Sequence, residues 1–113
     1  MEKSEKLKKL IDFLKTKKTN SLKVLDISNI SILADYFVIV TVSTERNVEA
    51  IDSEICDEME KNGYSYKSKE GIHTKWVLID YSDIIIHIFD DEYKDFYNLD
   101  KLWADAKVII DEN

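Results

Sequence analysis

Residues 76–89, WVLIDYSDIIIHIF, restrict the possible folds of this chain more than any other segment. Two runs rich in β-branched and aromatic residues stand on either side of the short polar link SD, and this pattern predicts a β-hairpin. We expect its strands to cover residues 74–81 and 84–89. A hairpin of this kind needs a further layer to bury its aliphatic side chains.

Side chains alternate between the two faces of a strand, so the hairpin separates two kinds of surface. In the register that we expect, Trp76, Asp80 and His87 share one face. The Ile and Val side chains then point to the opposite face, toward the helices. The histidine within IIIHIF is therefore a catalytic group, a structural group or part of a recognition surface.

The remaining segments predict an α/β (α+β) domain with a single mixed sheet of about five strands and packed helices. The expected elements are, in order, helix 3–18, strands 21–27 and 35–42, helix 43–63, strands 64–69, 74–81 and 84–89, and a helix within 90–106. The strand at 35–42 is apolar on both faces, which is typical of a central strand, and the strand at 64–69 is expected near an edge.

The segment 43–63 carries the clearest helix signals in the chain. Ser43 or Thr44 can cap its first turn, and Gly63 suits the position after its last turn because glycine tolerates a left-handed backbone. Helical spacing predicts one buried face, formed by Val48, Ile51, Ile55 and Met59.

Length and composition indicate one soluble domain over residues 1–113, without a proline or a low-complexity linker. No apolar run approaches the ~20 residues of a membrane span, and the first residues do not resemble a signal peptide. Cys56 is the only cysteine, which fits a reducing cytoplasmic location, and we expect it to be a small buried side chain.

The net charge of −7 argues against nucleic acid as the main partner, since phosphate binding needs an excess of Lys and Arg. An acidic domain suits a basic protein partner, because opposite fields speed the encounter. The same negative charge also keeps a protein soluble. The charge alone therefore does not establish a basic partner.

Catalytic and metal-binding interpretations find little support in the sequence. Asp80 could orient His87 as a general base, but there is no nucleophile at a sharp glycine turn. A zinc site needs at least three convergent ligands, and His73 stands fourteen residues from His87 without a cysteine beside either. The acids at 90–92 are expected to cap a helix. No phosphate-binding loop is present, so we predict no cofactor and no metal.

Two non-catalytic interpretations of His87 remain. Its ring could be satisfied by a neighbouring acid near the edge of the sheet. It could also belong to an interaction surface, because Trp, Tyr and Phe beside a few charges are typical of interface hot spots.

Several motifs occur together and in a characteristic order. They are Leu25-Asp26, ADYFVI at 34–39, Glu70-Gly71, WVLID at 76–80, HIF at 87–89 and FYNLDKLW at 96–103. In this combination the chain resembles the ribosomal silencing factor family, also called Iojap-like, over about residues 3–107. The sequence departs from the usual family pattern at Val42, where glycine is common, and at Asn47, Lys94 and Asp100.

The resemblance implies a nucleotidyltransferase-like fold without the catalytic motif of that superfamily. In agreement, the chain has no Gly-Ser helix start followed by paired D-x-D carboxylates. It further implies a translation repressor, not an enzyme, that binds the large ribosomal subunit through the fourteenth ribosomal protein. Bound there, such a protein sterically blocks joining with the small subunit.

We therefore predict a recognition surface, on a monomer or homodimer, with Trp76 as its anchor. The predicted partner-binding residues are Trp76, Asp80, His87, Phe89, Lys94 and Tyr97. The alternatives are a nucleotidyltransferase-like, magnesium-dependent enzyme that uses Asp26, Asp35 or Asp80, and an adaptor for a different basic protein.

Overall fold

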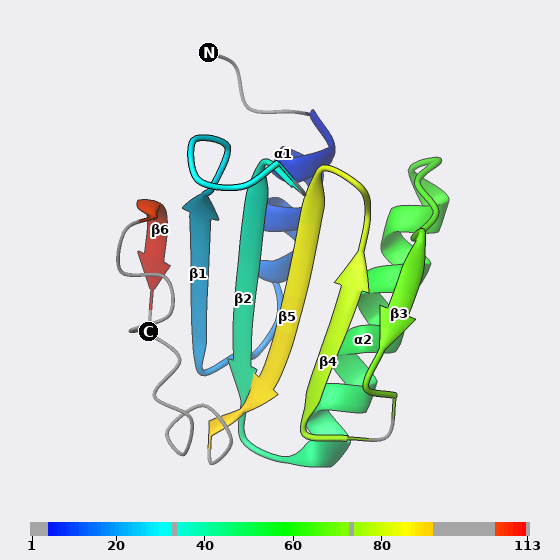
Figure 1. The fold of residues 1–113 in the computed structure, drawn as a ribbon. Coiled ribbons are helices and arrows are strands. Elements are labelled where there is room, and N and C mark those ends of the chain that lie inside the picture. Colours follow the sequence, from blue (N-terminus) through cyan, green and yellow to red (C-terminus); the bar gives the residue numbers. More distant parts are fainter. Residues whose placement is uncertain (1–4, 33, 73, 92–105, 113) are drawn as a thin grey trace.

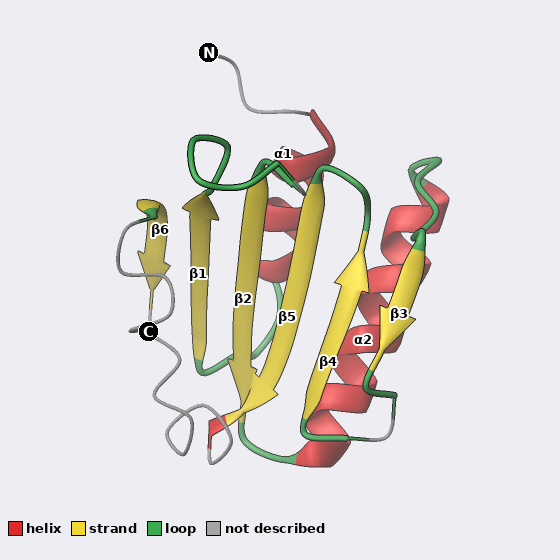
Figure 2. Ribbon diagram, viewed as in Figure 1, coloured by secondary structure: helices red, strands yellow, loops and turns green. Residues whose placement is uncertain are grey.

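The computed structural model describes residues 5–32, 34–72, 74–91 and 106–112, and its centre is one mixed sheet (Figure 1). Six strands lie in the order β3-β4-β5-β2-β1-β6. Their bounds are β1 Ser21–Asp26, β2 Tyr36–Val42, β3 Ser68–Glu70, β4 Trp76–Asp80, β5 Ile84–Asp90 and β6 Lys107–Glu112. Helices α1 (Glu5–Leu14) and α2 (Glu45–Lys61) both lie behind the sheet in the view of Figure 2. The predicted fold class is thus confirmed.

Strand pairing confirms the predicted hairpin and the central strand. β4 and β5 are antiparallel, and the turn between them contains Ser82 with a φ of 77°. β2 pairs with β5 in parallel and with β1 in antiparallel fashion, which makes the sheet mixed. Val42 ends β2 and is 2% exposed.

Helix α2 begins and ends where its capping residues predict. The Thr44 hydroxyl accepts a hydrogen bond from the Asn47 amide at 3.1 Å, which satisfies one of the free amides of the first turn. The helix ends before Gly63, whose φ is +86°. Its predicted buried face is confirmed, since Val48, Ile51, Ile55 and Met59 are all buried.

Two predicted elements differ clearly in extent from the structure. The strand expected at 64–69 is wrong in extent, because only Ser68–Glu70 pair with β4. The amide of Tyr64 instead bonds to the carbonyl of Met59 at 2.9 Å and closes the end of α2. The first helix ends at Leu14, four residues earlier than predicted. The helix expected within 90–106 lies almost entirely outside the described residues.

β6 was not predicted, and it makes the sheet one strand larger than expected. It pairs with β1 in antiparallel register, with a bulge between Val24 and Leu25 of β1. Its side chains are exposed or half-buried, so it lacks the strong apolar pattern of the inner strands. Strands at the edge of a sheet commonly show this weaker pattern.

The sheet separates two groups of buried side chains. The larger cluster fills the space between the sheet and the helices, with Leu7 and Leu10 of α1 and Ile86 of β5 among its members. A smaller cluster lies on the opposite face and includes Leu25, Ile39 and Phe89. Among the described residues, no helix is both long and apolar enough to cross a membrane.

A candidate recognition surface around His87

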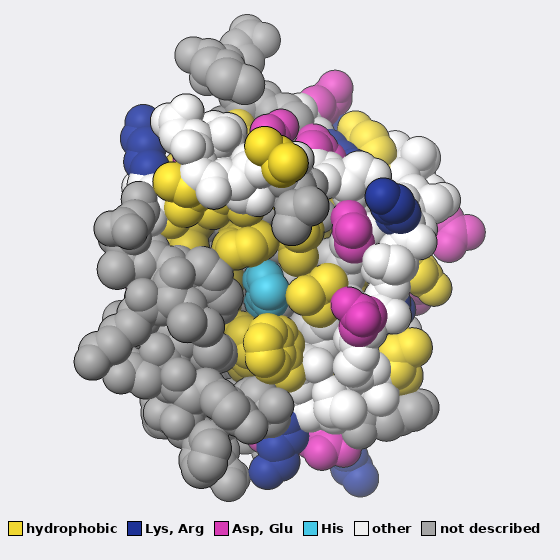
Figure 3. Space-filling model, viewed as in Figure 1, with side chains coloured by type: hydrophobic (Ala, Val, Ile, Leu, Met, Phe, Trp, Pro, Cys, Tyr) yellow, Lys and Arg dark blue, Asp and Glu magenta, His cyan; other side chains and the backbone are white. Residues whose placement is uncertain are grey.

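The sheet face opposite the two helices carries an aromatic and aliphatic surface, which we call the His87 face. Figure 3 shows hydrophobic side chains above, below and to the right of the histidine. β2, β4 and β5 supply this surface, because alternate residues of each strand point to the same side. We define the His87 face by Phe37, Ile39, Trp76, Leu78, Ile85, His87 and Phe89.

Strand register brings the predicted hairpin residues to one side of the sheet. Trp76 lies opposite Phe89, and His87 lies opposite Leu78. Asp80, opposite Ile85, points to this same side. The prediction that Trp76, Asp80 and His87 share a face is therefore confirmed.

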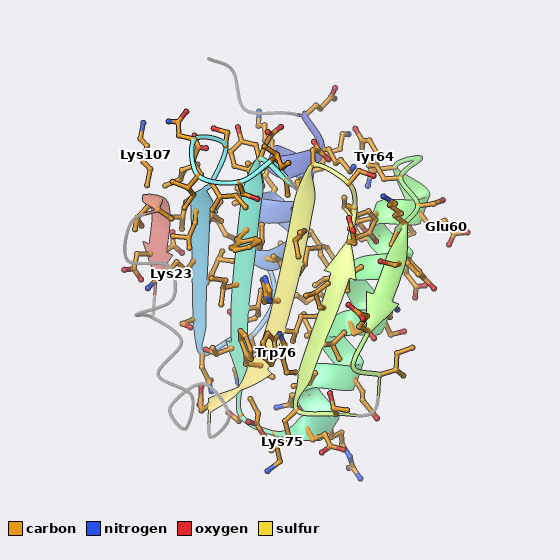
Figure 4. All side chains as sticks on the ribbon, in the orientation of Figure 1. Lys23, Glu60, Tyr64, Lys75, Trp76 and Lys107 are labelled. Atoms are coloured by element: carbon orange, nitrogen blue, oxygen red, sulfur yellow. The ribbon has the colours of Figure 1, made fainter. Side chains whose placement is uncertain are left out.

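A hydrogen bond from Trp76 and ring contacts with Phe37, Trp76 and Phe89 hold His87 in place. The Trp76 indole Nε1–H donates to His87 Nδ1 at 3.2 Å. Phe37 meets the imidazole edge-on, with ring centroids 4.8 Å apart, and Phe89 stacks parallel to it at 5.9 Å. Figure 4 shows Trp76 near the lower end of β4 in that view. Packed rings with one defined hydrogen bond restrict both side chains to one arrangement.

Burial sets the charge state of His87. The residue is 5% exposed, and desolvation lowers the pKa of its imidazole from 6.5 to about 4. The ring is therefore neutral at neutral pH, and because Nδ1 accepts from Trp76, its proton lies on Nε2. Such a low pKa makes His87 a weak general base at neutral pH.

Asp80 is not the partner of His87 Nδ1 that the catalytic interpretation required. Its Oδ1 accepts a hydrogen bond from the Ser82 amide at 2.7 Å and so stabilises the turn between β4 and β5. The Nδ1 atom is bonded to Trp76 instead. The orientation of the imidazole is thus set by an indole, which cannot accept a proton in a charge relay.

Of the other predicted site residues, the structure describes Phe89 but not Lys94 or Tyr97. Phe89 is fully buried and packs against Trp76, with ring centroids 5.0 Å apart. Lys94 and Tyr97 lie outside the described residues, so their place at this surface stays a prediction. Phe89 can therefore support the surface from below, while the partly exposed Trp76 can reach a partner.

Sequence analysis missed the contribution of β2 and of the sheet margin. Phe37 and Ile39 lie next to Ile85 and His87 in register, and the alternation within YFVIV was the available signal. Glu70 lies opposite Leu78 and so joins Asp80 on this side. Figure 3 shows acidic side chains next to the hydrophobic area. The surface therefore combines an apolar centre with an acidic margin on its β3–β4 side.

The carboxylates of the enzymatic alternative do not converge on a described metal site. No group of three or more His, Cys, Asp or Glu side chains that could hold a metal occurs within the described ranges. Asp26 accepts hydrogen bonds from the Ser28 hydroxyl at 2.6 Å and its amide at 2.9 Å, and these bonds lower the pKa of the carboxyl. Asp26 thus stabilises a turn, as Asp80 does.

The fold and this surface define an α+β domain with helices on one sheet face and an aromatic surface on the other. A family model described as "Ribosomal silencing factor during starvation" matches residues 1–113. The chain belongs to the ribosomal silencing factor family.

Individual relatives agree with this assignment. The chain is 40% identical over 91 residues to a ribosomal silencing factor of Bacillus subtilis, covering 80% of this chain and 77% of that protein. It is 34% identical over 110 residues to one from Halalkalibacterium halodurans, covering 96% and 94%. The chloroplastic Iojap protein of Zea mays is 28% identical over 81% of this chain and 40% of its own length.

Solved structures show the same fold. A crystal structure from Bacillus halodurans matches with a TM-score of 0.79 at 30% identity, covering 92% of this chain and 95% of the other. A crystal structure from Chromobacterium violaceum matches with the same TM-score at 27% identity, covering 92% and 88%.

Proposed function

We propose that this protein acts in the cytoplasm by binding the large ribosomal subunit through its His87 face and sterically blocking the joining of the small subunit. The family resemblance names the fourteenth protein of the large subunit as the contact. The main observation in support is the Trp76–His87 hydrogen bond at the centre of an apolar surface with an acidic margin. No covalent step is required for this activity.

The composition of the surface suits a basic protein with an apolar centre of its own. Trp76 supplies a large amphipathic side chain of the type that dominates interface energetics. Its hydrogen bond to His87 restricts the indole before binding, so less conformational entropy is lost on association. Glu70 and Asp80 at the margin favour a partner whose flanking groups are basic.

The size of the domain is sufficient for a steric mechanism. Its Cα atoms span 35 × 33 × 24 Å. A standard interface covers ~800 Å² on each partner, which leaves most of such a domain projecting from the surface to which it binds. A projecting domain on the subunit-facing side prevents a second large body from docking there.

Purified ribosomal subunits provide the direct test. The protein is incubated with large subunits, small subunits are added, and joined particles are resolved by sedimentation. We expect the protein to sediment with large subunits and to lower the fraction of joined particles. If the subunits join equally well with the protein present, and it does not sediment with large subunits, the proposal is wrong.

Substitution of Trp76 connects this activity to the His87 face. We expect Trp76→Ala to weaken binding to large subunits by roughly 2–4 kcal/mol, the loss typical of a central aromatic anchor. Tyr66→Ala is the matched control, because Tyr66 is 46% exposed and contacts Tyr81 of the helix-facing core. Binding is measured well below the melting temperature of each variant. Equal affinities for the two variants would place the contact elsewhere.

A further inference from the structure

The turn that leads into β4 is tied together around one hydroxyl group. The Thr74 Oγ1 atom lies 2.5 Å from the carbonyl oxygen of Gly71 and 2.8 Å from that of Trp76, and can donate its proton to either. The same oxygen accepts from the Trp76 amide at 3.2 Å. The Thr74 amide also donates to the Gly71 carbonyl at 3.0 Å. Both backbone polar groups of Trp76 thus contact one side chain.

Gly71 is required at its position for two separate reasons. Its φ is +80°, a left-handed conformation that glycine adopts without steric cost. A Cβ at this position would also overlap the carbonyl oxygen of Trp76 and would lie only 3.1 Å from Thr74 Oγ1. By contrast, Gly63 has a similar φ of +86°, but a Cβ there meets no atom within 4 Å.

The backbone on the other side of Trp76 is also held. The Asp90 amide donates to the Lys75 carbonyl at 3.1 Å, which joins the start of β4 to the end of β5. Figure 4 shows Lys75 and Trp76 together at this end of the sheet. The indole Nε1 reaches His87 at 3.2 Å from this fixed backbone, so a shift of the turn moves the indole away from its acceptor.

We propose that Gly71 and Thr74 are positioning residues for the His87 face. They form a clasp, defined by Gly71, Thr74 and Trp76, that sets the backbone of Trp76 and thereby orients its indole before a partner binds. Orientation in advance lowers the entropic cost of association. The effect on binding rests on the proposed function, whereas the orientation of Trp76 is a property of this chain alone.

The two glycines provide a matched pair of variants. The chain has two tryptophans, so Trp103→Phe gives a background in which Trp76 alone reports by fluorescence. Gly71→Ala and Gly63→Ala both place a Cβ at positive φ, and we expect both to lower the melting temperature. Only Gly71→Ala should shift the emission of Trp76 and weaken binding to large subunits, by about tenfold.

Thr74 provides a second pair that does not depend on how well a glycine variant folds. Thr74→Val keeps the shape of the side chain but removes the hydroxyl, whereas Thr74→Ser keeps the hydroxyl. We expect Thr74→Val to shift the Trp76 emission and to weaken binding several-fold. Thr74→Ser should retain both the parental spectrum and the parental affinity.

Different outcomes test the clasp and the proposed ribosome binding. The clasp is refuted if Gly71→Ala matches Gly63→Ala in emission and affinity, or if Thr74→Val behaves as Thr74→Ser does. If the parent protein itself does not bind large subunits, the proposed function fails. The emission of Trp76 in the four variants then decides whether the clasp orients the indole.

Discussion

His87 is a titratable side chain that is part of the His87 face in its neutral form. Three aromatic rings exclude water from it, and Trp76 donates to its Nδ1 atom. An imidazolium would have to release that hydrogen bond, because both ring nitrogens of the cation are donors. The neutral ring therefore belongs to the folded state, and its protonation opposes folding.

Acid should destabilise the protein through His87. Its pKa is about 4 when folded and near 6.5 when unfolded, so the unfolded state binds more protons between these values. The contribution of His87 to the free energy of unfolding is fully present above about pH 6.5. It falls by about 2–3 kcal/mol as the pH drops toward 4. Urea unfolding of the native protein and of His87→Phe at about pH 7 and pH 4.5 measures this loss.

The carboxylates common to both proteins cancel in that comparison. The native protein should therefore lose more free energy of unfolding than His87→Phe over the same pH interval. Identical losses would mean that His87 is as easily protonated in the folded state as in the unfolded one.

The edge strand β3 is short, and an ion pair with helix α2 helps to hold it in place. It has only three residues, but Lys69 at its centre forms a 2.9 Å ion pair with Asp52 of α2. Both side chains are largely buried, at 13% and 11% exposure. Burial alone would lower the pKa of Lys69, yet the interactions with Asp52 and Cys56 together outweigh it and raise the pKa. The ion pair thus holds β3 against the helix layer.

Removing one partner of this pair should be costly. We expect Lys69→Met to lower the free energy of unfolding by about 3 kcal/mol, because the Asp52 carboxylate would remain buried without its cation. The double variant with Asp52→Leu should recover most of the loss. Thermal or urea unfolding of both single variants and the double variant measures the coupling.

An exposed ion pair is the control for this cycle. Lys17 and Glu54 approach to 2.6 Å, but their side chains are 32% and 42% exposed. Lys17→Met should cost no more than about 1 kcal/mol. Equal losses for the two lysines would show that burial does not govern the energy of these pairs.

The two faces of the sheet carry different kinds of side chain. α1 and α2 cover the aliphatic face and form the larger core cluster together with it, whereas the opposite face carries the aromatic side chains of the His87 face. The chain as a whole carries a net charge of −7. Long-range attraction and local packing should therefore affect different steps of binding.

Salt should separate those two steps. We expect the association rate with large subunits to fall roughly tenfold from low to physiological ionic strength, because screening weakens attraction to a basic partner. The dissociation rate should change little with salt but rise in Trp76→Ala, which removes short-range contacts. Stopped-flow mixing at two salt concentrations measures both rates. An association rate independent of salt would refute the electrostatic part of the proposal.

Local patterns predicted much of this fold. The β4–β5 hairpin, the cap at Thr44 and the buried face of α2 follow from neighbours in the chain, and all are confirmed. β6 was missed because an edge strand needs little apolar pattern of its own when β1 supplies the hydrogen bonds. The length of β3 was overestimated because Tyr64 closes the end of α2 instead.

The sequence by itself determined the two faces of the hairpin, since alternation along a strand depends only on backbone geometry. With an assumed hairpin register it also placed Trp76 and His87 on one side, and the structure confirms that register. Only the tertiary structure decided that Trp76, and not Asp80, bonds His87 Nδ1, and that Gly71 must lack a Cβ. Both depend on register and on how closely distant backbone atoms approach, which no local pattern encodes.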